Sequence, residues 1–154
     1  MWLLDTNVVS EVRKVRSGKA DPNVSRWAER VEPAELYMSV ITLHELELGV
    51  LLAERRDPAQ GAVLRTWLEN HVHPAFAGRI LSVDEAVARQ AAQLHVPDPR
   101  PVRDALIAAT AQVRGMTVVT RNVVDFAPMG VPVLNPWTAI HGPVTEGLTT
   151  TDTE

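Results

Sequence analysis

Short apolar runs alternate along the chain with longer segments in which apolar residues recur at helical spacing. The short runs are typical of buried strands and occupy residues 2–4, 36–41, 80–83, 117–120 and 131–134. The longer segments predict helices over residues 8–12, 22–31, 63–72, 85–94 and 101–114, and a further helix that begins after Ser39 or Thr42 and ends near residue 55. Strands separated by helices in this way indicate an α/β domain with a mainly parallel central sheet of about five strands.

Residues that favour helix ends mark several of these boundaries. Asp21, followed by a proline, is a suitable N-cap for the second helix, and either Ser39 or Thr42 is suitable for the third. Pro58 is expected to break the chain after the third helix, and Gly115 is expected to end the last one. The predicted helices therefore have a physical start or stop signal as well as a periodic pattern.

Composition places the chain among ordinary globular proteins, with 45% hydrophobic and 22% charged residues in a length of 154. We expect one domain over residues 1–138 and a flexible polar tail over residues 139–154. The apolar stretches fall short of the ~20 residues that span a bilayer, and the first residues lack the order of a signal peptide, so we expect a cytoplasmic protein without membrane contact. The absence of cysteine excludes disulfides and thiolate metal sites.

A net charge of −4 and a pI near 5.7 argue against a protein that coats nucleic acid with one large basic face. Contact with RNA would need local clusters of positive charge. The candidates are Arg13, Lys14, Arg16, Lys19 and Arg121, with Arg100 and Arg103 as further possibilities. A solvated loop without a ligand is the alternative explanation for the first four.

Four carboxylates follow or flank the ends of predicted strands, and each has a simpler structural explanation. Asp5 is a good helix cap, and Glu45 closes a capping box if Thr42 is the cap. Asp104 stands in a first helical turn, where the macrodipole favours negative charge, and Asp125 suits a turn.

Taken together, these acids point to a metal site. The carboxyl ends of parallel strands meet at one edge of a sheet, where ligands collect, so the four side chains are expected to converge there. A divalent cation relieves the resulting repulsion, and oxygen-only ligation favours Mg²⁺ or Mn²⁺. The sequence has no His-x-x-x-His pair, no nucleophile elbow and no glycine-rich phosphate loop that would favour another chemistry.

Several short motifs in this order resemble those of the PIN-domain ribonucleases, especially the VapC-like and FitB-like toxins of bacterial toxin–antitoxin pairs. The motifs are LLDTNVVSE at 3–11, SVITLHEL at 39–46, DALIAATA at 104–111, TRN at 120–122 and NPW at 135–137. The similarity extends from residue 1 to about residue 137. It implies a three-layer α/β/α domain with a central, mainly parallel sheet.

The resemblance also implies a Mg²⁺- or Mn²⁺-dependent endoribonuclease that hydrolyses RNA phosphodiester bonds. Asp5 and Asp104 would be the principal metal ligands and Glu45 would complete the acidic cluster. Supporting roles fall to Thr6, Asn7 and Thr120. The fourth family position, often Asp, is Asn122 here, which leaves Asp125 as a substitute close by.

The same family suggests a homodimer that is held inactive by a cognate antitoxin protein. Two other functions stay open on the residues alone. A catalytically silent binding module would keep the scaffold and pair only with a partner, and the loss of Asp at position 122 favours it. A phosphatase with Asp5 as nucleophile would need a second aspartate two residues later, where the chain has Asn7.

Overall fold

Five parallel strands form the centre of the molecule. The computed structural model describes residues 1–138, so the predicted flexible tail lies outside the described residues. The strands are β1 (Trp2–Leu4), β2 (Leu36–Ser39), β3 (Ile80–Leu81), β4 (Thr117–Val119) and β5 (Val133–Leu134). Their order in the sheet is β3-β2-β1-β4-β5, and every neighbouring pair is parallel. The predicted parallel sheet of five strands is confirmed.

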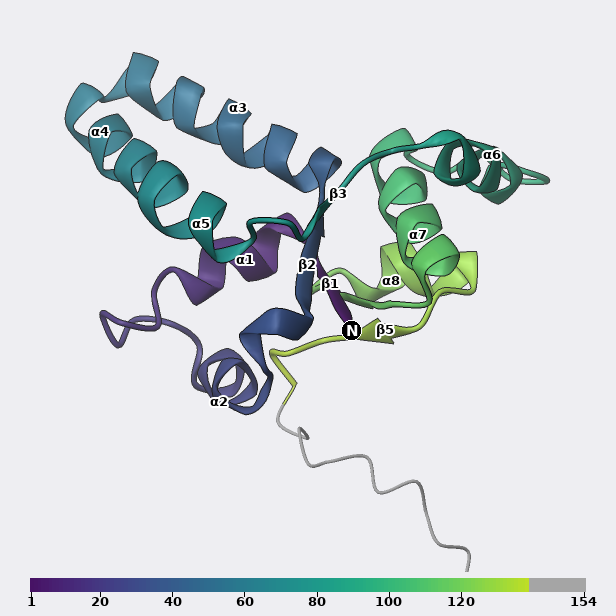
Figure 1. Ribbon diagram of the computed structural model, residues 1–154, viewed down its shortest axis with the longest axis horizontal. Coiled ribbons are helices and arrows are strands. Elements are labelled where there is room, and N and C mark those ends of the chain that lie inside the picture. Colours follow the sequence, from purple (N-terminus) through teal and green to yellow (C-terminus); the bar gives the residue numbers. More distant parts are fainter. Residues whose placement is uncertain (139–154) are drawn as a thin grey trace, which may run out of the picture.

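Helices cover both faces of this sheet (Figure 1). The α-helices are α1 (Thr6–Val12), α2 (Pro22–Arg30), α3 (Val40–Arg56), α4 (Pro58–Trp67), α5 (His73–Ala75), α6 (Glu85–Leu94), α7 (Val102–Arg114) and α8 (Val123–Phe126). Shorter turns of helix are the 3₁₀ segments η1 (Pro33–Glu35) and η3 (Ala127–Met129) and the π-helical segment η2 (Leu68–Val72).

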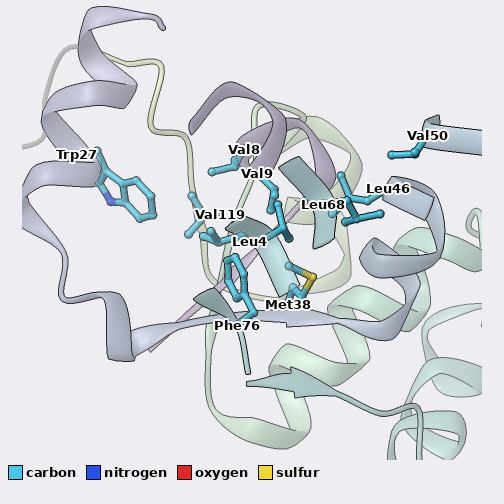
Figure 2. Close-up of a cluster of buried hydrophobic side chains, with 11 residues drawn as sticks. Leu4, Val8, Val9, Trp27, Met38, Leu46, Val50, Leu68, Phe76 and Val119 are labelled. Atoms are coloured by element: carbon cyan, nitrogen blue, oxygen red, sulfur yellow. The ribbon is translucent and has the colours of Figure 1, made fainter. Parts of the chain in front are cut away.

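The alternation of side chains along the strands divides the core into two main parts. Leu4, Met38 and Val119, from three adjacent strands, pack on one face with residues of α1, α2, α3 and η2, and Figure 2 shows this cluster. Leu3 and Val118 point to the other face and pack against α7 and α8. A smaller cluster joins α6 to α7. The predicted three-layer α/β/α architecture is therefore confirmed.

Side-chain caps and one glycine set several helix boundaries, and those expected at Asp21 and Gly115 are confirmed. Asp21 accepts hydrogen bonds from two backbone N–H groups of α2, and Asp84 accepts one from Val87 of α6. Gly115 adopts the left-handed conformation, at φ +67°, that ends α7. Ser39, one of the two alternatives for α3, is its cap, because its hydroxyl accepts from the backbone N–H of Ile41 at 3.0 Å.

The structure corrects some predicted boundaries. The strand predicted for 36–41 ends at Ser39, because this cap starts α3 at Val40. The chain changes direction at Pro58, but no long break in helical structure follows. Asp57 caps α4, and Pro58 is the first residue of this helix, five residues before the predicted start. The turn predicted after β4 is the short helix α8 followed by η3.

Helices α3 and α4 form an antiparallel hairpin that extends away from the sheet (Figure 1). Gly61 of α4 lies against the backbone of Glu54 in α3, so the two helices approach closely there. Arg65 ties the hairpin together through ion pairs with Glu47 and Glu54, at 2.8 Å each. None of the helices in residues 1–138 is both long and apolar enough to cross a membrane.

Candidate active site

Three of the four predicted acids, Asp5, Glu45 and Asp104, meet at the edge of the sheet where the parallel strands end, whereas Asp125 makes no hydrogen bond or ion pair with them in the part of the chain that the structure describes. Asp5 directly follows β1, and Thr120 directly follows β4. Glu45 lies in the second turn of α3, the helix that continues from β2. Asp104 reaches the same edge from the other direction, because α7 leads into β4 and therefore begins where that strand ends. The topology thus brings together residues up to 115 positions apart.

Asp5 is the most deeply placed member of this cluster, with 1% of its side chain exposed. Its Oδ1 accepts from the backbone N–H of Thr6 at 2.8 Å, so it caps α1. Its Oδ2 accepts from the hydroxyl of Thr120, also at 2.8 Å. Asp5 therefore caps α1 through one oxygen while its other oxygen faces Thr120, so its role as a cap is compatible with the predicted role in the site.

Glu45 belongs to the cluster and does not close a capping box. The cap of α3 is Ser39, while the Thr42 hydroxyl is buried without a hydrogen-bond partner among residues 1–138. The Glu45 carboxylate instead accepts from the hydroxyl of Thr6 at 3.2 Å and from the guanidinium of Arg103. The capping-box alternative is wrong, since the helix starts one turn earlier than that motif requires.

Asp104 stands in the first turn of α7, as predicted, with 11% of its side chain exposed. Its Oδ1 accepts from Nη1 of Arg103, the preceding residue, at 2.7 Å. The same guanidinium also donates to Asp5 and to Glu45. One arginine therefore binds all three carboxylates, and this is the most specific feature of the site.

The electrostatics of the cluster explain why Arg103 stays charged there. Burial alone lowers the pKa of its guanidinium, but the negative charge of Asp5 and the hydrogen bonds to Asp5, Glu45 and Asp104 outweigh that effect and raise the pKa above its ordinary value. Three carboxylates face one guanidinium, so when all are ionised the cluster keeps an excess of two negative charges. A divalent cation has the matching charge.

The chemistry of these carboxylates fits a hard divalent cation, whereas their present spacing is not that of a metal site. All three acidic groups offer carboxylate oxygens, the ligands that Mg²⁺ and Mn²⁺ prefer. Nevertheless, no group of three His, Asp or Glu side chains within residues 1–138 is arranged to hold a metal ion. The guanidinium of Arg103 lies between the carboxylates and takes up the bonds that a metal would otherwise make.

The proposed fourth position lies next to the cluster. The backbone N–H of Asn122 donates to the Thr120 hydroxyl at 3.0 Å, and the side-chain amide of Asn7 donates to the same oxygen at 3.5 Å. Asn122 is thus two hydrogen bonds from Asp5. Asp125 is exposed in the first turn of α8, and its side chain makes no hydrogen bond or ion pair among the described residues.

The basic residues proposed for RNA contact have different surroundings. Lys14 is paired with Glu11 at 3.1 Å, and Lys19 is exposed in the loop after α1. The guanidinium of Arg13 stacks on Trp67, 5.6 Å from the centre of the ring. Arg13 and Arg16 also line a cavity of about 780 Å³ on the α1 and α4 side of the molecule.

Arg121 is closer to the carboxylates than those four residues. Its backbone N–H donates to the side chain of Asn7 at 3.3 Å, and its guanidinium stacks on Trp137, 5.2 Å from the ring centre. Its charge therefore lies beside the loop that supplies Thr120. The same holds for the aromatic surface of Trp137, which is partly buried against the core.

Arg103 is the functional residue that sequence reasoning placed incompletely. We predicted it only as a further RNA contact, whereas the structure puts it at the centre of the acidic cluster. Its position directly before Asp104 is the only signal in the sequence. That signal is weak because a residue beside a ligand need not point toward the same site.

Comparison with known proteins gives the family. Residues 2–127 match the PIN domain family. The chain is 38% identical to the toxin FitB of Neisseria gonorrhoeae over 143 residues, which cover 89% of this chain and 99% of FitB. It is 35% identical to the VapC ribonuclease Y4jK of Sinorhizobium fredii over 142 residues, covering 89% and 98% of the two chains.

Solved structures agree with these relatives. A structure of FitAB bound to an IR36 DNA fragment superimposes with a TM-score of 0.82 at 37% identity, over 92% of this chain and 99% of the matched one. The family match over residues 2–127 contains every carboxylate described above, and therefore includes the edge of the sheet that carries the acidic cluster. The chain therefore belongs to the PIN domain family.

Proposed function

We propose that this chain is an endoribonuclease that uses Mg²⁺ or Mn²⁺ and acts in the cytoplasm as the toxin of a toxin–antitoxin pair. The observation that carries the proposal is the convergence of Asp5, Glu45 and Asp104 at one edge of the sheet. Relatives named as a toxin and as a ribonuclease, each matched over almost its full length, support the same activity. Carboxylate-only ligation supports a hard cation over zinc.

In this proposal Asp5 and Asp104 hold the metal and Glu45 completes its surroundings. A bound divalent cation would stabilise the negative charge that develops on the phosphate during attack by water. Thr120 keeps Oδ2 of Asp5 oriented through its 2.8 Å hydrogen bond. Burial of Asp5 keeps its carboxylate away from competing water, which strengthens its electrostatic interactions.

Glu45 is suited to accept the proton of the attacking water. Its side chain is 30% exposed, so substrate and solvent reach it more easily than they reach Asp5. The water oxygen forms a bond to phosphorus as Glu45 takes its proton. The bond from phosphorus to the leaving ribose oxygen breaks, and that oxygen gains a proton from solvent. Thr6 orients Glu45 through the 3.2 Å bond from its hydroxyl.

The cavity beside α1 supports the proposal that this chain binds a partner protein. It is about 780 Å³ in volume, and its walls include Val9, Val12, Trp67 and Phe76, with Arg13 at its side. An apolar hollow with basic residues suits an amphipathic, partly acidic segment of an antitoxin. We also propose a homodimer, for which the exposed leucines of α3 are candidate contacts: Leu48, Leu51 and Leu52.

The decisive experiment compares RNA cleavage by wild type, Asp5→Asn and Asp104→Asn with Mg²⁺ or Mn²⁺ present. We expect each variant to lose cleavage while keeping its circular dichroism spectrum. Glu85→Gln is the matched control, since it removes one exposed carboxylate from α6, away from the cluster. Full cleavage by Asp5→Asn would refute the site. No cleavage by the wild type would favour the silent binding module.

The same assay identifies the fourth residue. Asn122→Ala and Asp125→Asn are compared at limiting metal concentration, where a weakened site loses most activity. We expect the larger loss for Asn122→Ala, because Asn122 is two residues from Thr120, whose hydroxyl binds Asp5, whereas the Asp125 side chain makes no hydrogen bond or ion pair among the described residues. A larger loss for Asp125→Asn would instead show that α8 turns its acid toward the cluster when RNA and metal bind.

A further inference from the structure

Arg103 stands at the point where the three carboxylates meet. Its Nη2, Nε and Nη1 donate to Asp5, Glu45 and Asp104, so each nitrogen has its own acidic partner. The partners come from the end of β1, from α3 and from α7. All three nitrogens of the planar guanidinium thus bind carboxylates, an arrangement that the single nitrogen of a lysine side chain could not reproduce.

Arg103 is also more exposed to solvent than two of its three acidic partners. Its side chain is 32% exposed, while those of Asp5 and Asp104 are only 1% and 11% exposed. A cation that binds Oδ1 of the buried Asp5 therefore competes with Arg103 for that oxygen. The long aliphatic stem lets the charged end turn outward while its backbone stays in the first turn of α7.

A metal ion and this guanidinium cannot bind the cluster in the same way at once. Mg²⁺ needs oxygens at about 2.0–2.1 Å in a compact shell, whereas a guanidinium spreads its donors over a wider fork. The present spacing follows the guanidinium, since no three acidic or histidine side chains of residues 1–138 are grouped for a metal. Repulsion between the two cations adds to this conflict.

We propose that Arg103 is a built-in competitor of the divalent cation: it pairs with Asp5, Glu45 and Asp104 and offsets one of their three negative charges while metal is absent, and it must swing out of the cluster before a metal binds. The swing leaves its positive charge at the mouth of the site, on the path of an approaching phosphate. Arg103 is thus a positioning residue, and it sets the concentration of free metal ion that the site needs for binding. This inference rests on the proposed metal-dependent function.

The test is titration calorimetry of full-length protein with MnCl₂, after removal of metal by a chelator. The variants are Arg103→Gln and Arg103→Lys. We expect Arg103→Gln to bind Mn²⁺ at least about tenfold more tightly than wild type, which corresponds to about 1.4 kcal/mol. Arg103→Lys should fall between them, because an ammonium is a point charge without the fork.

Arg114→Gln is the matched control. It removes the same charge from the other end of α7, where Arg114 lies 3.7 Å from Asp84. Its Mn²⁺ affinity should equal that of wild type. A tenfold gain in this control as well would mean that net charge alone sets the affinity, and would overturn the competition.

Two further measurements separate displacement from a general effect. With chelator present, Arg103→Gln should melt at a lower temperature than wild type and recover when Mn²⁺ is added, because its three carboxylates lack a counter-ion. In ¹⁵N-labelled wild type, the Nε–H signal of Arg103, assigned by its absence in Arg103→Gln, should shift as diamagnetic Mg²⁺ is added. An unmoved signal at saturating Mg²⁺ would refute the swing.

The outcomes also distinguish this inference from the proposed function. Equal Mn²⁺ affinity in wild type and Arg103→Gln would overturn the competition and leave the metal-dependent nuclease intact. Absence of binding in both, with Asp5→Asn equally inert, would overturn the metal site itself and the competition with it. If Arg103→Gln fails to fold with or without metal, Arg103→Lys decides: an affinity equal to wild type overturns the competition.

Discussion

The close approach of α3 and α4 makes one glycine predictable in both sign and size. A Cβ added at Gly61 would lie 2.3 Å from Cα and 2.6 Å from the backbone N of Glu54. Ordinary carbon–carbon contacts are about 3.5–4.0 Å, so Gly61→Ala must move the two helices apart by about 1 Å. Backbone atoms cannot turn away as a flexible side chain can.

The expected cost follows from two opposing effects. Overpacking of this kind costs about 1–3 kcal/mol, and replacing glycine by alanine inside a helix returns about 1 kcal/mol. Because the clash is with backbone atoms at 2.3 and 2.6 Å, the overpacking cost should lie in the upper part of that range, at about 2–3 kcal/mol. We therefore expect Gly61→Ala to lower the free energy of unfolding by about 1–2 kcal/mol, and more if the hairpin is rigid. For a chain of this length that is a fall in Tm of about 2–8 °C.

Gly49 provides a control of opposite sign. It is also inside a helix, α3, but is exposed, and a Cβ there meets nothing within 4 Å. Gly49→Ala should raise the free energy of unfolding by about 0.5–1 kcal/mol. Urea unfolding followed by circular dichroism measures both variants. Equal or increased stability of Gly61→Ala would refute the packing argument.

Two other predictions concern buried polar contacts. Thr120→Val should lower the free energy of unfolding by about 1–3 kcal/mol and slow RNA cleavage, because Oδ2 of Asp5 loses its hydroxyl donor; urea unfolding and initial rates check this. Glu11→Gln tests a pH effect: the backbone N–H of Asp21 lowers the pKa of Glu11 below its usual 4.5. Because the pKa of Glu11 is lower in the folded than in the unfolded state, wild type should be more stable than the variant above about pH 4.5. This advantage should disappear as the pH falls through the folded pKa, and melting curves from neutral to acidic pH measure the difference in stability.

Local chemistry explains why much of the fold was predictable. The strands at 2–4 and 117–119 are short apolar runs. Such a run between two helices is typical of a strand in a parallel sheet, because helices cover both faces of that sheet and bury the strand. Asp21 and Gly115 mark helix ends by hydrogen bonding and by left-handed backbone, which depend on a few neighbouring residues. Pro58 was misplaced because a proline suits both a break and a first helical turn.

The amino-acid sequence alone established the α/β order of elements, the family motifs and the acids that follow strands. The tertiary structure decided what those acids contact. It showed that Glu45 serves the cluster instead of a capping box, that Asp5 both caps α1 and receives Thr120, and that Arg103 joins all three carboxylates. Helix and strand signals arise within a few residues, whereas the contacts of Glu45 with Thr6 and Arg103, and of Asp5 with Thr120 and Arg103, join positions 39 to 115 apart. Only packing of the complete sheet brings these residues within hydrogen-bonding reach.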